Sequence, residues 1–379
     1  MSSIKATILR ITLLILLVAA VLTVVINRTS AQNPTTPTPT ALAEKTVEQT
    51  HTNIQVLKGL PESQLIPVMN FMGASLGVRC TYCHVNKDGK WDFPSDEKPE
   101  KKTAREMITM VMGINKGNFR GNPEVSCYTC HRGRTSVVHT LSLPLPAPEP
   151  RPSPAPSPTT PQPANPTAEQ IFDKYYQALG GNEALDKLKS RVMKGTLVTG
   201  QGEVAYTLTQ SGADSVHAII TTPQGVIERA LNGATGWEKS NRGVRDLSDG
   251  EISYVRRYSL LYPDLKLKDQ FTRTSFGGKQ KIDERDVYVV RGTTTTGKRE
   301  TLFFDVESGL LVRRTSLTTT LVGQIPEQVD FADYKDVDGM KLPFTIRISA
   351  VDPSYSGVRK FTEIKLNAPV DPKQFNKPA

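Results

Sequence analysis

Cysteine, histidine and tryptophan are scarce in this chain, and long runs of like charge are missing. The 379 residues include 4 Cys, 5 His and 2 Trp. The formal net charge is +9, but the basic residues are scattered singly, so we expect no nucleic-acid partner. No cysteine precedes Cys80, and we therefore expect no lipid anchor on a mature N-terminal cysteine.

One long apolar run lies near the N-terminus. Residues 11–26 carry no charge, and Lys5 and Arg10 precede them. This pattern is typical of an export signal, although the run is long for a cleaved signal and slightly short for a membrane-spanning helix. We expect residues 1–31 to direct export. The rest of the chain then lies on the periplasmic side of the cytoplasmic membrane if the segment is retained as an anchor, or in the periplasm if it is cleaved.

Proline divides the remaining chain. Residues 32–40 form a short spacer, and residues 143–167 have proline at nearly every second position. Such a segment can neither continue a helix nor pair as a strand, so it predicts an extended linker. It separates a first module, residues 41–142, from a second, residues 168–379. We expect each module to bury its own core and to fold alone.

The first module has the apolar spacing of two helices and is predicted to be small and all-α. One face of the first helix, which ends at Gly77, carries Leu65, Met69, Met72 and Leu76. The second helix is predicted to open with a capping box at Thr103 and Glu106 and to stop near Gly117. Its apolar face carries Met107, Met110, Val111 and Ile114.

The second module has the pattern of an antiparallel sheet. Thr167 is a good N-cap for a short helix that ends at Gly180. Many short alternating segments follow between residues 191 and 367, and residues 305–309 (DVESG) predict a hairpin turn. The fold class expected for residues 168–379 is therefore a half-barrel-like antiparallel sheet with a helix or two against it, an α+β arrangement.

Two short motifs contain all four cysteines. Cys80 and Cys83 are followed by His84, and Cys127 and Cys130 are followed by His131. Two thiols at this spacing can bond both vinyl groups of a haem, and the next residue, a histidine, lies under the iron. The motifs predict two covalently bound haem c groups.

Three other uses of these cysteines fit less well. A zinc site usually has its cysteine pairs about 15–20 residues apart, and zinc would leave the two histidines unexplained. Thioredoxin-like pairs lack the histidine and need a strand-to-helix setting. Two disulfides are compatible with export, but not with the repeated histidine.

Each iron needs a second axial ligand if the haems only transfer electrons. Met69 and Met107, one on each helix, are the preferred candidates, with Met72 and Met110 as alternatives on the same faces. The histidine alternatives are His51 and His139, and His217 is expected to be an ordinary strand residue.

Other residues near the motifs can contact the haems or have only a structural position. Arg132 and Arg134 can pair with haem propionates or belong to a solvated loop. Tyr82, Trp91 and Tyr128 can pack on the macrocycles or belong to an ordinary core.

Residues 58–134 resemble the cytochrome subunit of photosynthetic reaction centres. The likeness rests on residues 69–85 (MNFMGASLGVRCTYCHV), 105–115 (REMITMVMGIN) and 125–133 (VSCYTCHRG). The resemblance implies Met69 with His84 and Met107 with His131 as axial pairs. The chain departs from that family in having two motifs where four are typical. It also lacks the family's lipid-anchoring cysteine and the histidine expected after the second helix. Segments of the second module loosely resemble periplasmic lipoprotein-sorting carriers.

The sequence therefore predicts an electron carrier rather than an enzyme. Its expected partner is a membrane-bound or periplasmic redox protein, either a reaction centre or a respiratory complex. One alternative is a dihaem peroxidase, which would keep one iron five-coordinate. The other is a protein whose second module binds a lipid or quinone, a lipophilic ligand that the haems would sense or reduce.

Overall fold

The computed structural model describes residues 44–140 and 165–378. The predicted export segment (residues 1–31), the spacer (32–40) and most of the proline-rich linker lie outside these ranges. Among the helices within the ranges, none is long and apolar enough to cross a membrane.

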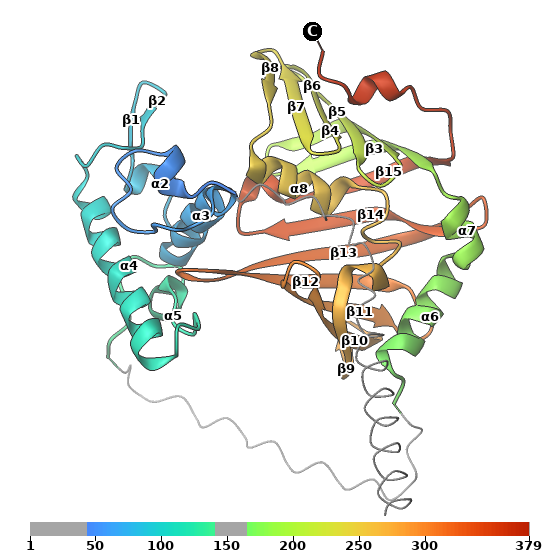
Figure 1. Ribbon diagram of the computed structural model, residues 1–379, viewed down its shortest axis with the longest axis horizontal. Helices are drawn as coiled ribbons and strands as arrows, with labels where there is room; N and C mark the ends of the chain where they lie inside the picture. The colour runs from blue at the N-terminus through green and yellow to red at the C-terminus, as the bar shows by residue number, and fades with distance from the viewer. Residues whose placement is uncertain (1–43, 141–164, 379) are drawn as a thin grey trace, which may run out of the picture. The chain divides into compact units, whose positions relative to one another are not determined.

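The helical module contains four α-helices, short 3-10 turns and one small hairpin (Figure 1). In chain order its elements are α2 (Val47–Thr50), η1 (Glu62–Gln64), α3 (Leu65–Leu76), η2 (Cys80–Tyr82), β1 (Val85–Lys87), β2 (Lys90–Asp92), α4 (Pro99–Asn118) and α5 (Cys127–His131).

The two long helices of this module have different boundary signals. Helix α3 ends as predicted at Gly77, which has the left-handed conformation (φ 69°) of a helix C-cap. The predicted start of the second helix at Thr103 is wrong, because α4 begins at Pro99, one turn earlier. Proline is suited to the first turn, where its missing N–H is not needed. Gly117 does not stop this helix, which continues to Asn118.

The buried faces of α3 and α4 differ from the predicted ones. Helix α3 buries Leu65, Val68, Phe71 and Ser75, and α4 buries Ile108, Val111 and Asn115. The face that carries the methionines therefore lies beside the buried face in both helices. The 3.6-residue period allows either choice, and the aromatic Phe71 and the β-branched residues occupy the core.

The strand-rich module begins with two helices, α6 (Ala168–Leu179) and α7 (Asn182–Lys187), as the sequence predicted. Thr167 caps α6 by accepting a hydrogen bond from the Gln170 amide at 3.2 Å, and Gly180 ends it. The third α-helix described in this module is α8 (Asp249–Ser259), which the sequence pattern did not reveal. It opens with a capping box between Ser248 and Glu251.

Thirteen strands form one antiparallel sheet, in the order β8-β7-β6-β5-β4-β3-β15-β14-β13-β12-β11-β10-β9. It consists of two meanders, β3–β8 and β9–β15, joined by the pairing of β15 with β3. In Figure 1 the strands run from β8 at the top to β9 at the bottom. The bounds are β3 (Ser190–Thr199), β4 (Gly202–Ser211), β5 (Ser215–Thr222), β6 (Gly225–Asn232), β7 (Thr235–Ser240), β8 (Gly243–Asp246), β9 (Phe271–Ile282), β10 (Arg285–Thr294), β11 (Arg299–Asp305), β12 (Leu311–Thr320), β13 (Gly323–Val337), β14 (Met340–Ala350) and β15 (Gly357–Leu366).

One face of this sheet is covered by its own helices. The apolar side of α6, including Phe172, Tyr175 and Leu179, joins α8 and the segment after it in a single core cluster with the strands. Phe172 and Tyr175 both contact the ring of Phe304 on β11, with centroids 5.8 and 5.4 Å apart. Aromatic pairs at these separations stabilise a core beyond their area alone.

The helical module does not bury its core alone. Its cluster, which includes Val47, Leu60, Val68 and Phe71, also contains Val322 and Ile325 from the hairpin between β12 and β13. Val322 is completely buried, and Lys45–Ala379 form one compact unit. The expectation of two separate cores is therefore wrong at this hairpin, because its apolar side chains pack into the cluster of the helical module although they are far from it in sequence.

Truncating Val322 tests this shared core. Val322→Ala should destabilise the helical module by about 1–3 kcal/mol, because it removes buried methyl groups from its cluster. Unfolding is to be followed by visible circular dichroism of the haems, which reports on that module. The exposed neighbour Leu321 supplies the control, since Leu321→Ala should change stability by less than about 0.5 kcal/mol. An unchanged haem-detected transition in Val322→Ala would mean that the two cores are independent.

Candidate functional site

The first motif lies on a tight turn directly after α3. Cys80 opens the 3-10 turn η2, and the amides of Cys83 and His84 both bond to the Cys80 carbonyl, at 3.3 and 2.9 Å. Both thiols therefore come from one turn, with Cys80 exposed and Cys83 half-buried. Burial raises the pKa of the Cys83 thiol.

The second motif forms the short helix α5. Ser126 is its N-cap and forms a capping box with Thr129. The amide of Ser126 donates to the Thr129 hydroxyl at 3.0 Å. Burial also raises the pKa of the Cys127 thiol, while Cys130 on the same helix is exposed.

His131 is oriented for ligation by the backbone that follows it. Its Nδ1–H donates to the carbonyl oxygen of Arg134 at 3.0 Å. This bond fixes the tautomer and leaves Nε2 with its lone pair free, as metal-ligating histidines require. The segment after His131 turns back through the left-handed residues Arg132 (φ 48°) and Gly133 (φ 82°). The backbone of Arg134 therefore has a role here that its side-chain type did not suggest.

The two motifs are joined by a direct backbone contact. The amide of Gly133 donates to the carbonyl of Ser75 in α3 at 2.8 Å. Gly77 lies so close that a Cβ at this position would clash with the Gly133 carbonyl oxygen. Since Gly77 precedes the first motif and Gly133 follows the second, this contact fixes the separation of the two attachment sites.

A buried asparagine holds the loop before the second motif. Asn115 of α4 is 3 % exposed, and its side-chain amide bonds both backbone groups of Val125, accepting from N–H at 2.9 Å and donating to C=O at 2.7 Å. Asn115 occupies the core position one turn after Val111. A polar residue in an apolar helical face is the sequence signal that could have revealed this role.

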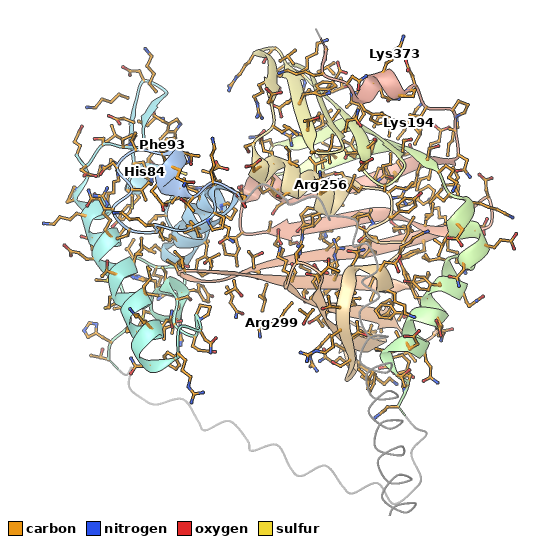
Figure 2. The ribbon with its side chains drawn as sticks, in the orientation of Figure 1. His84, Phe93, Lys194, Arg256, Arg299 and Lys373 are labelled. Carbon is orange, nitrogen blue, oxygen red and sulfur yellow. The ribbon has the colours of Figure 1, made fainter. Side chains whose placement is uncertain are left out.

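His84 lies beside a compact charged network. The ring of Phe93 meets the His84 ring edge-on, with centroids 5.2 Å apart (Figure 2). The segment that begins at Phe93 wraps around the ammonium group of Lys101, which donates to the carbonyls of Phe93, Pro94 and Ser95 at 2.8, 3.0 and 2.7 Å. Burial lowers the pKa of His84, and the charge of Lys101 lowers it further.

Asp96 completes this network. Its carboxylate forms ion pairs with Arg105 at 2.9 Å and with Lys101 at 3.2 Å, and it accepts a hydrogen bond from Asn53. The bonds from Arg105 and Asn53 hold the pKa of Asp96 well below its usual range. Two cations therefore face one carboxylate beside His84, which leaves a net positive charge. The sequence analysis missed this network because its members are spread over 53 positions.

The candidate methionine ligands lie in two environments. Met69 and Met72 are partly buried and pack against the core of the helical module. Met107 and Met110 are 37% and 46% exposed on α4. The structure places each pair on one helical face and leaves the choice within each pair open.

The alternative histidines are spread over the described residues. His51 lies 3.7 Å from Glu62, and His139 is exposed at the end of the first described range. His217 lies on β5 as expected, where it is buried, 3.2 Å from Glu228 and in ring contact with Trp237.

The helical module exposes apolar side chains that a bound haem could cover. Several large apolar side chains of this module are exposed to solvent: Ile66, Tyr82, Trp91, Phe93, Met107, Met110, Phe119, Tyr128, Val137 and Val138. Exposed apolar patches of this kind mark binding sites for large apolar partners. Two thiol pairs, an oriented histidine and this surface together fit covalently bound haem.

The zinc alternative finds no support in the described ranges. Within residues 44–140 and 165–378, the cysteine, histidine and acidic side chains form no group of three that could hold a metal ion. No disulfide joins the four cysteines, all of which lie in the described ranges.

Comparison with known proteins finds a family model that is similar to the helical module. Residues 18–143 match the family model described as photosynthetic reaction centre cytochrome C subunit. The module is similar to the reaction-centre cytochromes. This match confirms the resemblance noted in the sequence, and it supports a c-type cytochrome with covalently bound haem c.

Two relatives show how far the similarity extends. Cytochrome c-554 of Chloroflexus aurantiacus is 39% identical over 87 residues, which are 21% of this chain and 20% of that protein. The photosynthetic reaction center cytochrome c subunit of Roseobacter denitrificans is 35% identical over 97 residues, 24% of this chain and 26% of that protein. The chain thus spans about a fifth to a quarter of the length of these relatives.

The strand-rich module has more distant structural relatives. A LolA superfamily protein from Nitrosomonas europaea aligns over 56% of this chain and 99% of its own, with 15% identity and a TM-score of 0.39. The weaker likeness noted in the sequence, to lipoprotein-sorting proteins, recurs here. This level of similarity says nothing about the function of the strand-rich module.

Adding a Cβ atom at position 77 should disturb both cysteine motifs. Gly77→Ala introduces strain at φ 69° and a clash with the Gly133 backbone, so we expect a loss of about 2 kcal/mol or more in stability. Gly113→Ala is the matched control, because Gly113 lies inside α4 with open space around it. That variant should be neutral or stabilise by up to about 1 kcal/mol. Urea unfolding measures the stability of both variants. An equal change in the two would show that the contact between Gly77 and Gly133 does not stabilise the module.

Removing the Lys101 charge should lower the potential of the first haem. A nearby cation disfavours the oxidised iron, so Lys101→Gln should shift one of two midpoint potentials downward, by about 60 mV if the one-electron equilibrium changes tenfold. Lys102→Gln removes an exposed charge from the next residue and should have little effect. Spectroelectrochemical titration separates the two haems. A fall of equal size in both variants would contradict a specific role for Lys101.

Proposed function

We propose that this protein is an exported dihaem c-type cytochrome that transfers electrons. Thioether bonds from Cys80 and Cys83 hold one haem, and those from Cys127 and Cys130 hold the other. The observation that carries the proposal is the hydrogen bond from His131 Nδ1 to the Arg134 carbonyl, which presents Nε2 as an iron ligand at the end of a Cys-x-x-Cys helix. At the first motif His84 is the proposed iron ligand, and its buried Nδ1 has no hydrogen-bond partner within the described ranges.

The haem irons supply the one-electron chemistry, and the chain sets their environment. Met69 and Met107 are the proposed second ligands, with Met72 and Met110 as the alternatives. Thioether ligation raises the reduction potential relative to two histidines, and it leaves no open position for a substrate. This ligand set favours an electron carrier over a dihaem peroxidase.

The proposed partner is a membrane-bound or periplasmic redox protein. The family match supports a reaction centre, and a respiratory complex is the other candidate, because only two haem motifs are present. The proposed location is the periplasmic side of the cytoplasmic membrane, with residues 1–31 as signal or anchor. Domain limits at residues 41–142 and 168–379 remain part of this proposal, with the β12–β13 hairpin shared between the modules.

A lipophilic ligand of the strand-rich module would need space in the sheet. The face covered by α6 and α8 is filled by side chains, including Phe172, Tyr175 and Phe304. Electron transfer by the helical module is therefore the function that the described residues favour.

Haem attachment is tested by extraction and mass. Acid–acetone treatment should leave the colour on the protein, and the intact mass should exceed that of the polypeptide by two haems. Cys127→Ala with Cys130→Ala should retain one haem, attached through Cys80 and Cys83. Extractable haem, or bound zinc in its place, would exclude the proposal.

Methionine ligation is tested by spectroscopy. The oxidised protein should show the weak near-infrared band of a methionine–Fe(III) pair. Met69→Ala and Met107→Ala should each lower one potential and open one iron to carbon monoxide. The same effects in Met72→Ala or Met110→Ala would move the ligand by about one helical turn. Carbon monoxide binding to the unaltered protein would favour the peroxidase alternative instead.

A further inference from the structure

An open groove lies on the sheet, and Glu124, three residues before Cys127, also lines it. Its volume is ≈ 920 Å³, and β9 to β14 supply most of its lining. Three arginines line it, Arg273 on β9, Arg291 on β10 and Arg299 on β11, and Figure 2 labels Arg299. Residues with hydroxyl groups also line it: Ser275, Thr293, Thr301 and Thr315.

Strand register brings the three arginines together. Thr293 pairs with Arg273 on one side and with Arg299 on the other, so these two arginines flank it on the same face. Arg291 lies two residues before Thr293 and therefore on that face as well. With strands about 4.8 Å apart, the three side chains leave the backbone within about 10 Å of one another. Gly277 leaves room for Arg291, whose Nη1 would lie 3.0 Å from a Cβ at that position.

The charge of these arginines is not balanced within the described ranges. None of the three forms an ion pair or a side-chain hydrogen bond there. Glu300 and Glu327 also line the groove, but Glu300 alternates with Arg299 along β11, so its side chain points to the opposite face. There Arg257 lies 3.4 Å from Glu300 and 3.2 Å from Glu327, and Lys298 lies 3.2 Å from Glu327. The remaining carboxylate in the lining is Glu124. Like charges on neighbouring strands destabilise a sheet, so this arrangement has a cost that a bound anion would offset.

The arginines are not needed for the core. The residues that alternate with them, Val290 on β10 and Leu302 and Phe304 on β11, point to the opposite face and belong to the apolar cluster. Replacing an arginine in the groove therefore leaves that packing intact. This separation makes a binding role testable without loss of the fold.

We propose that this groove binds a small polyanion with phosphate or carboxylate oxygens and at least two negative charges. Guanidinium groups bind such oxygens through paired hydrogen bonds, and the threonine and serine hydroxyls complete the donor set. The groove's volume suits a small organic molecule better than a single ion. The strand-rich module would then be a ligand-binding module attached to an electron carrier.

Calorimetric titration with pyrophosphate tests the groove in the full-length haem-loaded protein. Saturable binding at one site is expected, with Arg273→Gln and Arg299→Gln each weakening it about tenfold or more, the effect of losing a charge-assisted hydrogen bond. The control is Arg242→Gln, which removes an exposed cation from the β7–β8 turn of the same sheet. That variant should bind within about twofold of the parent protein.

Each outcome decides the proposal. Loss of affinity in the two groove variants but not in Arg242→Gln supports it. Absence of saturable pyrophosphate binding, or equal weakening in all three variants, overturns it. Vesicles containing phosphatidylglycerol form the comparison arm: binding to them without binding of pyrophosphate would assign the arginines to a membrane surface and also overturn it. Because the readout is heat of binding, the result does not depend on whether the haem proposal holds.

Discussion

The contact between the Gly77 and Gly133 backbones is the constraint on which the helical module depends. It joins the end of α3, the start of the first motif and the end of the second. Electron transfer between the two proposed haems would need a constant separation, and a direct contact between two backbone segments leaves little room for that separation to vary. Asn115 and the turn at Arg134 then position the second motif relative to this contact.

Local signals in the sequence predicted much of the fold. Thr167 and Gly180 bounded α6, Gly77 ended α3, and residues 305–309 marked the β11–β12 hairpin, because caps and turns depend on a few neighbouring residues. Helix α8 and strands β7 to β9 and β13 were missed, since their pairing and burial come from partners distant in sequence. The start of α4 was misplaced because a capping-box pattern also occurs inside a helix, where the hydroxyl of Thr103 bonds the Pro99 carbonyl.

The candidate site was predictable in its reactive atoms but not in its surroundings. The motifs identify the four thiols and two histidines directly. The partners that orient or charge them, Arg134, Lys101 and Asp96, act through backbone carbonyls or through loops folded back from other elements. Such interactions follow no fixed spacing in the sequence. They are visible only when the chain is folded.

The hairpin that carries Val322 has a consequence for biosynthesis. The helical module's other core residues end at Ile108, more than 200 positions before Val322. During synthesis, which runs from the N-terminus, the cysteine motifs emerge long before the hairpin that completes the core of their module. On the proposed function, haem would therefore reach the motifs while the first module still lacks its contact with β12 and β13.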